Sequence, residues 1–125
     1  MNHFGLIKNF TANGTIGKRR IVAFGAAEGE AAQASGDAAF LGVSGIRGAA
    51  IAGARIDVCM DEIRDIEFGG AVAYGDWLTS DADGKAITAA PATGALMNVI
   101  GKAMTGAVAG SIGKVHVTPQ QITGA

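Results

Sequence analysis

Few residues of this sequence have the chemical types that catalysis or metal binding requires. The chain contains two histidines, His3 and His116, and a single cysteine, Cys59. A zinc site needs three or four ligands, and Cys59 belongs to no CxxC motif and lies near no HxxxH motif. A nucleophile elbow is also absent, because the chain contains no Gly-x-Ser-x-Gly motif. We therefore predict no catalytic residue, no metal ligand and no cofactor, and we interpret these three side chains as structural.

The carboxylates in the middle of the chain are a second place where chemistry could occur. Asp57, Asp61, Glu62, Asp65 and Glu67 follow one another closely, so that two of them could pair for general acid–base catalysis. Most of this segment alternates apolar and polar residues, however, as a strand with one buried face does. We therefore favour a solvated sheet face for these acids and predict that the protein is not an enzyme.

An acidic turn at residues 81–84 (DADG) raises the question of calcium binding. Aligning its Asp-Gly pair with the fifth and sixth positions of an EF-hand loop places Thr79 at the first position and Ala90 at the twelfth. Both positions need an acidic ligand, so the calcium motif is incomplete. Asp-Gly between two strand-like runs is instead a strong signal for a β-hairpin. We predict a hairpin turn here.

Charge is distributed unevenly along the chain, although the formal net charge is only −1. All eleven acids lie within residues 28–83, whereas residues 1–27 and 84–125 carry only basic charges. This pattern reflects either chance in a short chain or basic ends that meet an acidic protein surface. The run KRR at residues 18–20 lacks interleaved aromatic residues, which favours a solvated strand face. We therefore predict no direct binding of nucleic acid.

Length and composition indicate one small domain with a thin core. The chain has 125 residues, of which 25 are alanine and 20 are glycine, so hydrophobic burial depends on a few larger side chains. A single cysteine allows no intrachain disulfide. The longest uncharged run, residues 86–101, is shorter than the roughly 20 apolar residues of a membrane span. We therefore expect no membrane association, and synthesis in a reducing cytoplasm.

Short strand-like segments separated by glycine-marked turns predict an all-β fold, either a small β-sandwich or a barrel. We assign residues 1–15 to an extended N-terminal arm or first strand and residues 16–118 to the β domain. Residues 119–125 are assigned to a C-terminal tail, because Pro119 should stop the last strand. We expect the following apolar side chains of the strands to face the interior of the domain: Ile16, Val22, Phe24, Ile56, Val58, Met60, Ile66 and Phe68.

Residues 68–87 form the centre of the expected domain, because they hold the only tryptophan, the only tyrosine and the clearest hairpin signal. On either side of them the sequence contains a short internal repeat, which we call the echo. Residues 41–42 (LG), followed by 52–53 (AG), parallel residues 100–101 (IG), followed by 109–110 (AG). The echo predicts two similar β-hairpin units within one barrel or sandwich.

Several segments share a characteristic pattern of strand and turn residues. They lie at residues 20–25 (RIVAFG), 40–44 (FLGVS), 52–58 (AGARIDV), 68–86 (FGGAVAYGDWLTSDADGKA), 100–103 (IGKA) and 109–115 (AGSIGKV). Together they span nearly the whole chain, and they resemble the small capsid decoration (cement) proteins of tailed bacteriophages. Because these segments consist of turns and strands rather than catalytic motifs, the resemblance transfers no individual functional residue.

The resemblance implies a structural protein on the outer surface of a phage capsid, and hence a virion protein that is in the host cytoplasm during assembly. Such a protein would bridge neighbouring subunits of the major capsid protein, often as a homotrimer. We expect the N-terminal arm to bind the capsid or a neighbouring copy by strand pairing. The side chains expected to make this contact are Phe4, Leu6, Ile7, Lys8 and Phe10.

Two other functions are compatible with the sequence. A tail or fibre component built from a similar β module would self-assemble without affinity for capsid shells. A small hydrolase would use a serine, His116 and an acid. Replacing His116 by alanine would abolish the activity of such a hydrolase but leave a structural role unchanged.

Overall fold

The structure, a computed structural model, describes residues 7–36, 38–45, 48–49 and 51–124, without the side chains of Ile7 and Lys8. The described residues form ten strands, which confirms the predicted all-β fold, and they include no helix that could cross a membrane. The strands are β1 (Ile7–Ala12), β2 (Ile21–Phe24), β3 (Glu30–Gln33), β4 (Phe40–Ser44), β5 (Arg55–Cys59), β6 (Ile63–Glu67), β7 (Trp77–Ser80), β8 (Ala86–Thr88), β9 (Leu96–Ala103) and β10 (Ile112–Thr123).

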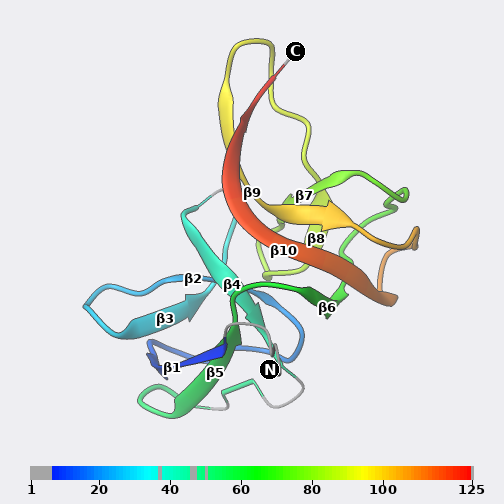
Figure 1. Ribbon diagram of the computed structural model, residues 1–125. Coiled ribbons are helices and arrows are strands. Elements are labelled where there is room, and N and C mark those ends of the chain that lie inside the picture. Colours follow the sequence, from blue (N-terminus) through cyan, green and yellow to red (C-terminus); the bar gives the residue numbers. More distant parts are fainter. Residues whose placement is uncertain (1–6, 37, 46–47, 50, 125) are drawn as a thin grey trace, which may run out of the picture.

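Strands β1 to β5 form a closed barrel in the order β1-β3-β2-β4-β5 (Figure 1). β1 closes the barrel, because it pairs antiparallel with β5 on one side and parallel with β3 on the other. The segment predicted as an arm or first strand is therefore, from Ile7 to Ala12, a strand of the barrel wall. The buried interior contains Phe10, Ala12, Ile16, Val22, Ala31, Leu41, Ala49, Ile56 and Val58.

Strands β6 to β10 form a second sheet in the order β6-β10-β9-β7-β8. Its two edge strands approach each other, since Phe68, directly after β6, makes a parallel bridge with Ala86 of β8. Beside this bridge, the amide of Gly69 donates to the carbonyl of Ala86 at 2.8 Å. The contact corresponds to the parallel pairing of β1 with β3, so the second sheet bends toward the same closed form.

The two sheets follow one plan, with β6 to β10 matching β1 to β5 in order. In each set of five, the second strand pairs with the third and the fourth, and the fifth strand pairs with the fourth and the first. Isolated antiparallel bridges also match, because Ile16 pairs with Ala49 and Val72 pairs with Ala107. We call β1–β5 the first repeat and β6–β10 the second repeat.

Repeated turns explain the echo in the sequence. Gly53 and Gly110 both adopt positive φ, at 87° and 84°, a conformation that glycine accepts without steric cost. The amide of Gly53 donates to the carbonyl of Ala12, and that of Gly110 donates to the carbonyl of Phe68, each at 2.8 Å. The predicted similarity of two hairpin units is thus confirmed, and it extends to all five strands of each repeat.

β4 lies at the centre of the molecule and contributes to both cores (Figure 1). All of its residues are buried, so its sequence FLGVS shows no apolar–polar alternation. Leu41 faces the barrel interior, whereas Phe40 and Val43 join Ile21 of β2 in a cluster with the second repeat. From the second repeat, this cluster includes Ile66, Phe68, Val72, Leu78, Ala86, Ile100, Ala103, Val115 and Val117. The hydrophobic core is therefore continuous across the two repeats.

Backbone hydrogen bonds also join the repeats, through the hairpin turn predicted at residues 81–84. The amide of Ile21 in β2 donates to the carbonyl of Gly84 at 2.7 Å. Within the turn, Gly84 has a φ of 78°, and the Asp81 carboxylate accepts a hydrogen bond from the amide of Lys85 at 2.9 Å. The hairpin prediction is confirmed, and the turn is also a contact with the first repeat.

Two predictions about strand ends are wrong. Phe24 is 62% exposed rather than inward-facing, because β2 ends at this residue and leaves its side chain beyond the barrel interior. β10 does not stop at Pro119 but continues to Thr123, so most of the predicted C-terminal tail is strand. A register shift between Val117 and Gln120 leaves Pro119 outside the ladder, where its missing N–H removes no ladder bond.

Candidate interaction surfaces

The described histidine, His116, and the single cysteine, Cys59, lie on different strands. His116 lies on β10 with an exposed side chain, opposite Lys102 of β9. Cys59 ends β5 and is half-buried, and this burial raises the pKa of its thiol, which disfavours the reactive thiolate. Within the described ranges, no three His, Cys, Asp or Glu side chains are grouped so as to hold a metal ion. His3 lies outside the described residues.

Two of the clustered carboxylates bind side chains of their own repeat. The Asp57 carboxylate accepts a hydrogen bond from the Asn9 amide at 2.7 Å. Asp65 of β6 forms an ion pair with Lys114 of β10. The partners are an amide and an ammonium group rather than a second carboxylate, so these acids fit the predicted solvated sheet face better than an acid–base pair.

Glu67 instead joins the two repeats and uses part of the basic run at residues 18–20. Its Oε1 lies 3.4 Å from Nη2 of Arg20, and its Oε2 lies 3.3 Å from Nζ of Lys85. Nη1 of Arg20 also donates to the carbonyl of Asp83 at 2.9 Å. Arg20 is therefore a contact between the repeats, which gives this basic residue a structural role.

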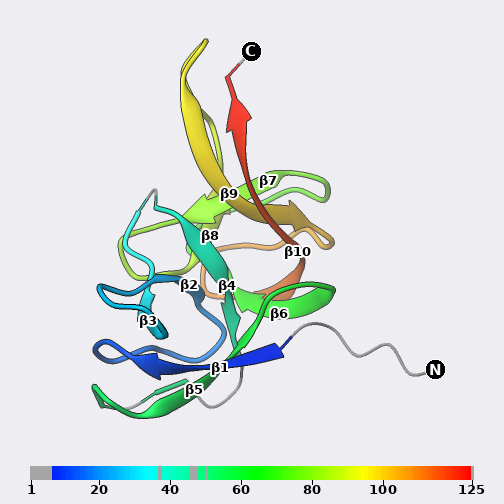
Figure 2. The same ribbon diagram turned by 60° about the vertical axis from the view of Figure 1, so that its left-hand side comes forward.

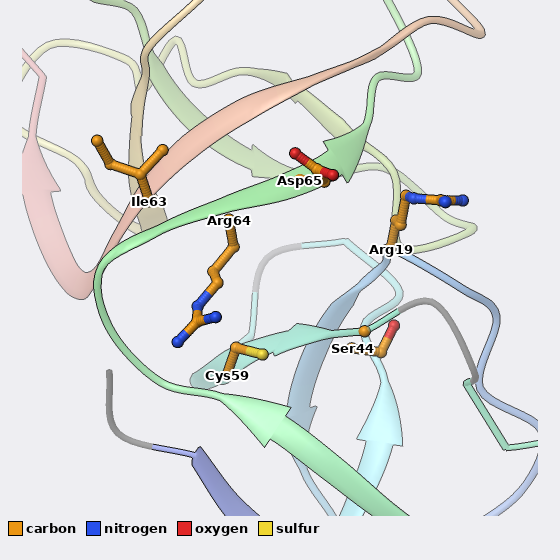
Figure 3. A pocket seen from close by; sticks show the side chains of 7 residues that line it. Arg19, Ser44, Cys59, Ile63, Arg64 and Asp65 are labelled. Atoms are coloured by element: carbon orange, nitrogen blue, oxygen red, sulfur yellow. The ribbon is translucent and has the colours of Figure 1, made fainter. Parts of the chain in front are cut away.

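A pocket of about 250 Å³ lies where β4, β5 and β6 meet (Figure 3). Its lining consists of Arg19, Ser44, Gly45, Cys59, Ile63, Arg64 and Asp65. Figure 3 shows Arg64 extending toward Cys59, while the side chain of Arg19 extends away from both. The Ser44 hydroxyl donates to the carbonyl of Gly17 at 2.7 Å. The described residues of the lining include no histidine to activate this serine, so they give the hydrolase alternative no support.

The predicted capsid-binding segment lies only partly within the described structure. Phe4 and Leu6 lie outside it, as do the side chains of Ile7 and Lys8. The backbone of Ile7 and Lys8 pairs with β5 in the barrel wall. Phe10 is 9% exposed and packs in the barrel interior, so its side chain is not available to a capsid. For Phe10 the predicted contact is wrong, because strand alternation turns this residue inward.

Large apolar side chains are exposed at one end of the second repeat. Tyr74 is 72% exposed, Val108 is 66% exposed and Ile112 is 49% exposed. The loops that carry Tyr74 and Val108 adjoin, because an antiparallel bridge joins Val72 to Ala107, and Ile112 begins β10 directly after the second loop. We call Tyr74, Val108 and Ile112 the apolar corner. A group of large exposed apolar residues in adjoining segments is typical of a contact surface, whereas single ones are not.

The matching corner of the first repeat has different chemistry. The counterparts of the apolar corner are Lys18, Ile51 and Arg55, which hold the same positions relative to the antiparallel bridge and the Gly53 turn. Ile51 is exposed like its counterpart, but the other two residues are cations. On one backbone plan, the second repeat therefore presents an apolar surface where the first presents a mainly basic one.

Strand and turn patterns do not find the apolar corner, because two of its residues lie in loops. The available signal in the sequence is composition. Residues 70–75 and 105–113 contain no charged residue, yet they include an aromatic and several aliphatic side chains. Loops at a protein surface are usually more polar, so uncharged loops of this kind indicate a covered surface.

These features define a class of protein: an all-β chain of two five-stranded repeats with an exposed apolar corner. No protein-family model matches the sequence, and no curated protein sequence matches it. Among solved structures, the chain is similar to the N base of the head fiber gp8.5 of bacteriophage phi29. This likeness has a TM-score of 0.68 at 16% sequence identity, and it covers 92% of this chain and 95% of that chain. The two proteins therefore share a fold over nearly their full lengths.

Proposed function

We propose that this protein is a structural component of a bacteriophage virion and binds the outer surface of the head. The observation that carries the proposal is the fold shared with the base of a phage head fiber, over nearly the full length of both chains. The resemblance of the sequence to capsid decoration proteins supports the same location. In its finer form, the proposal is that the protein stabilises contacts between subunits of the major capsid protein.

The apolar corner is the first proposed contact with the capsid. Tyr74 is a large aromatic side chain in an exposed loop, and such residues often dominate the binding energy of an interface. Val108 and Ile112 extend the apolar surface around it. Three side chains give only weak binding per copy, but many copies on a repeating lattice can remain attached through avidity.

The segment that precedes β1, together with the first two residues of β1, is the second proposed contact. Phe4, Leu6, Ile7 and Lys8 combine apolar surface with a positive charge, which suits an acidic protein surface. Deleting residues 1–12 would remove β1 and open the barrel, so that deletion cannot separate binding from folding. Deleting only residues 1–6 leaves β1 in place and is the cleaner variant.

Co-sedimentation with expanded shells of the major capsid protein from the same source tests the proposal. We expect saturable binding at a fixed ratio of protein to capsid subunit. Binding should persist at moderate salt, because the apolar corner carries no charge and is not weakened by ionic screening. Deletion of residues 1–6 should weaken binding without changing the far-ultraviolet circular dichroism spectrum. Failure of the full chain to bind at any salt concentration contradicts the proposal.

A head-fiber base is the second candidate function, and the same structural neighbour favours it. A fiber base would occupy a limited set of head positions, whereas a cement protein would occupy equivalent positions over the whole lattice. Electron microscopy of saturated shells distinguishes the two by the positions that carry extra density. Sparse occupation at saturating protein favours the fiber base, and lattice-wide occupation favours the cement protein.

A further inference from the structure

The second repeat contains an extension that the first repeat lacks. β9 and β10 continue past the ends of their counterparts β4 and β5, and residues 96–99 pair with residues 120–123. A parallel bridge between Thr93 and Gly124 lies at the tip. Figures 1 and 2 show these strands projecting from the body of the molecule. We call residues 96–99 and 120–123 the ribbon.

None of the described strands pairs with the outer edge of β10 along the ribbon. β6 pairs with β10 only as far as His116, which lies opposite Ile63. From Gln120 to Thr123, β10 pairs with β9 on one side, and no other described strand lies along its opposite side. The backbone groups on that side are therefore available to another strand.

Antiparallel geometry turns the backbone of Gln121 toward this open edge. Residue pairs in an antiparallel ladder alternate between pairs that exchange hydrogen bonds and pairs whose N–H and C=O groups point outward. Gln121 lies opposite Asn98, whose carbonyl accepts a hydrogen bond from the Thr79 hydroxyl at 2.9 Å. Thr79 belongs to β7, on the side of β9 away from β10, so Asn98 and Gln121 form an outward-pointing pair.

The ribbon lacks the charges that usually protect an open edge. Residues 86–101 and 115–125 contain no Asp, Glu, Lys or Arg. Natural proteins discourage pairing at open edges with charged side chains, prolines or bulges. Pro119 and its register shift lie before residues 120–123 and leave the rest of the edge open. Leu96 of the ribbon is 61% exposed, so the projecting strands present apolar surface as well as backbone groups.

We propose that the outer edge of β10, residues 120–123, pairs with the same edge of β10 in a second copy of this chain. Both strands of the ribbon are uncharged, so pairing between copies brings no like charges together and buries no unpaired charge. A two-stranded ribbon is only marginally stable by itself, and pairing between copies provides the three or more strands that a stable sheet needs. This self-association requires no capsid and is tested separately from capsid binding.

Replacing Gln121 by proline tests the pairing. Gln121→Pro removes an outward N–H and no bond to β9, so the ribbon should remain while strand addition is blocked. In sedimentation velocity over a range of concentrations, we expect the wild-type chain to form oligomers. The Gln121→Pro chain should associate at least about tenfold more weakly. Gln121→Val keeps the N–H and is the matched control, which should associate like the wild type.

Gln121→Lys is a second variant that leaves the backbone intact. It brings like charges into the contact between copies, so its association should weaken and recover partly at high salt. Thermal unfolding of each variant checks that the core is unchanged. A wild-type chain that stays monomeric at every concentration overturns the proposal. Association that neither Gln121→Pro nor Gln121→Lys weakens overturns it as well.

Discussion

The interiors of the two repeats place a large and a small side chain at exchanged positions. In the first repeat, the small Ala12 ends β1 and the larger Ile56 lies on β5, and both belong to the barrel interior. At the matching positions of the second repeat, Phe68 follows β6 and Gly113 lies on β10. A Cβ atom at Gly113 would lie 2.3 Å from Cε2 of Phe68, so a side chain there requires the ring to move. Each repeat thus combines one large and one small residue, in exchanged positions.

This exchange shows that the repeats share a backbone plan but not an interchangeable core. Protein interiors are close-packed, so the volume allowed at one position depends on its neighbour. The turn glycines Gly53 and Gly110 match in both repeats because the backbone conformation needs them. Apolar side chains can redistribute volume within the interior as long as the total is kept. The comparison therefore predicts strong energetic coupling between the exchanged positions.

The largest expected effect is the loss of Phe68. Phe68→Ala should lower the free energy of unfolding by about 3–5 kcal/mol, because it opens a cavity in the core shared by the repeats. Adding Gly113→Ile gives the combination found in the first repeat and should recover at least about 1 kcal/mol. Gly113→Ile alone should destabilise the protein more, because its Cβ clashes with the Phe68 ring as well as with Oγ1 of Thr105, which lies 2.5 Å away. Urea unfolding of the three variants measures the coupling.

The reciprocal exchange in the first repeat is the matched control. Ala12→Phe should overpack the barrel interior, and Ile56→Gly in the same chain should relieve part of that strain. Purely additive changes in the free energy of unfolding, in both repeats, would contradict the coupling that the comparison predicts.

An intermediate effect is expected from giving the apolar corner the chemistry of the first repeat. Tyr74→Lys combined with Ile112→Arg should weaken binding to capsid shells at least about tenfold, or about 1.4 kcal/mol. The free energy of unfolding should stay within about 0.5 kcal/mol of the wild type, because both side chains are exposed. Lys18→Ala in the first repeat is the control and should bind normally in co-sedimentation. Equal losses in both variants would mean that the two corners do not differ in function.

The smallest expected effect concerns the charged contact between the repeats. The Glu67 side chain is 23% exposed and lies near both Arg20 and Lys85. Glu67→Gln should lower the free energy of unfolding by about 1 kcal/mol, and by less at high salt, because partly exposed ion pairs are screened. Asp65→Asn breaks a more exposed pair within the second repeat and should cost less. Thermal unfolding at two salt concentrations compares the two variants. Equal losses of unfolding free energy would show that the contact between the repeats adds no stability beyond that of an ion pair within one repeat.

Local signals in the sequence predicted the features that depend on neighbouring residues. The Asp-Gly turn at residues 81–84 and the inward phase of Ile56, Val58 and Ile66 are confirmed, because turn chemistry and strand alternation act over a few positions. Closure of the barrel has no such signal. β1 meets β3 in parallel although β2 lies between them in the sequence, and only the assembled fold specifies that contact.

The wrong predictions came from local rules that tertiary structure overrides. Pro119 should stop a strand, but a register shift lets β10 continue beyond it. Phe10 fitted both a docking arm and an inward-facing strand, and barrel closure decides for the strand. The apolar corner was not predicted, because loops that come together in space leave only their composition in the sequence.

The hydrogen bond from Ile21 to Gly84 has a consequence for synthesis on the ribosome. The first repeat leaves the ribosome first. At that stage the amide of Ile21 has no Gly84 carbonyl to bind, and the side chains of Phe40 and Val43 are not yet packed against the second repeat. At 5–20 residues per second, the roughly sixty residues of the second repeat follow over about 3–12 s. During that interval the nascent chain exposes an apolar face that is prone to aggregate. Translation speed through the second half of the gene should therefore affect the yield of soluble protein.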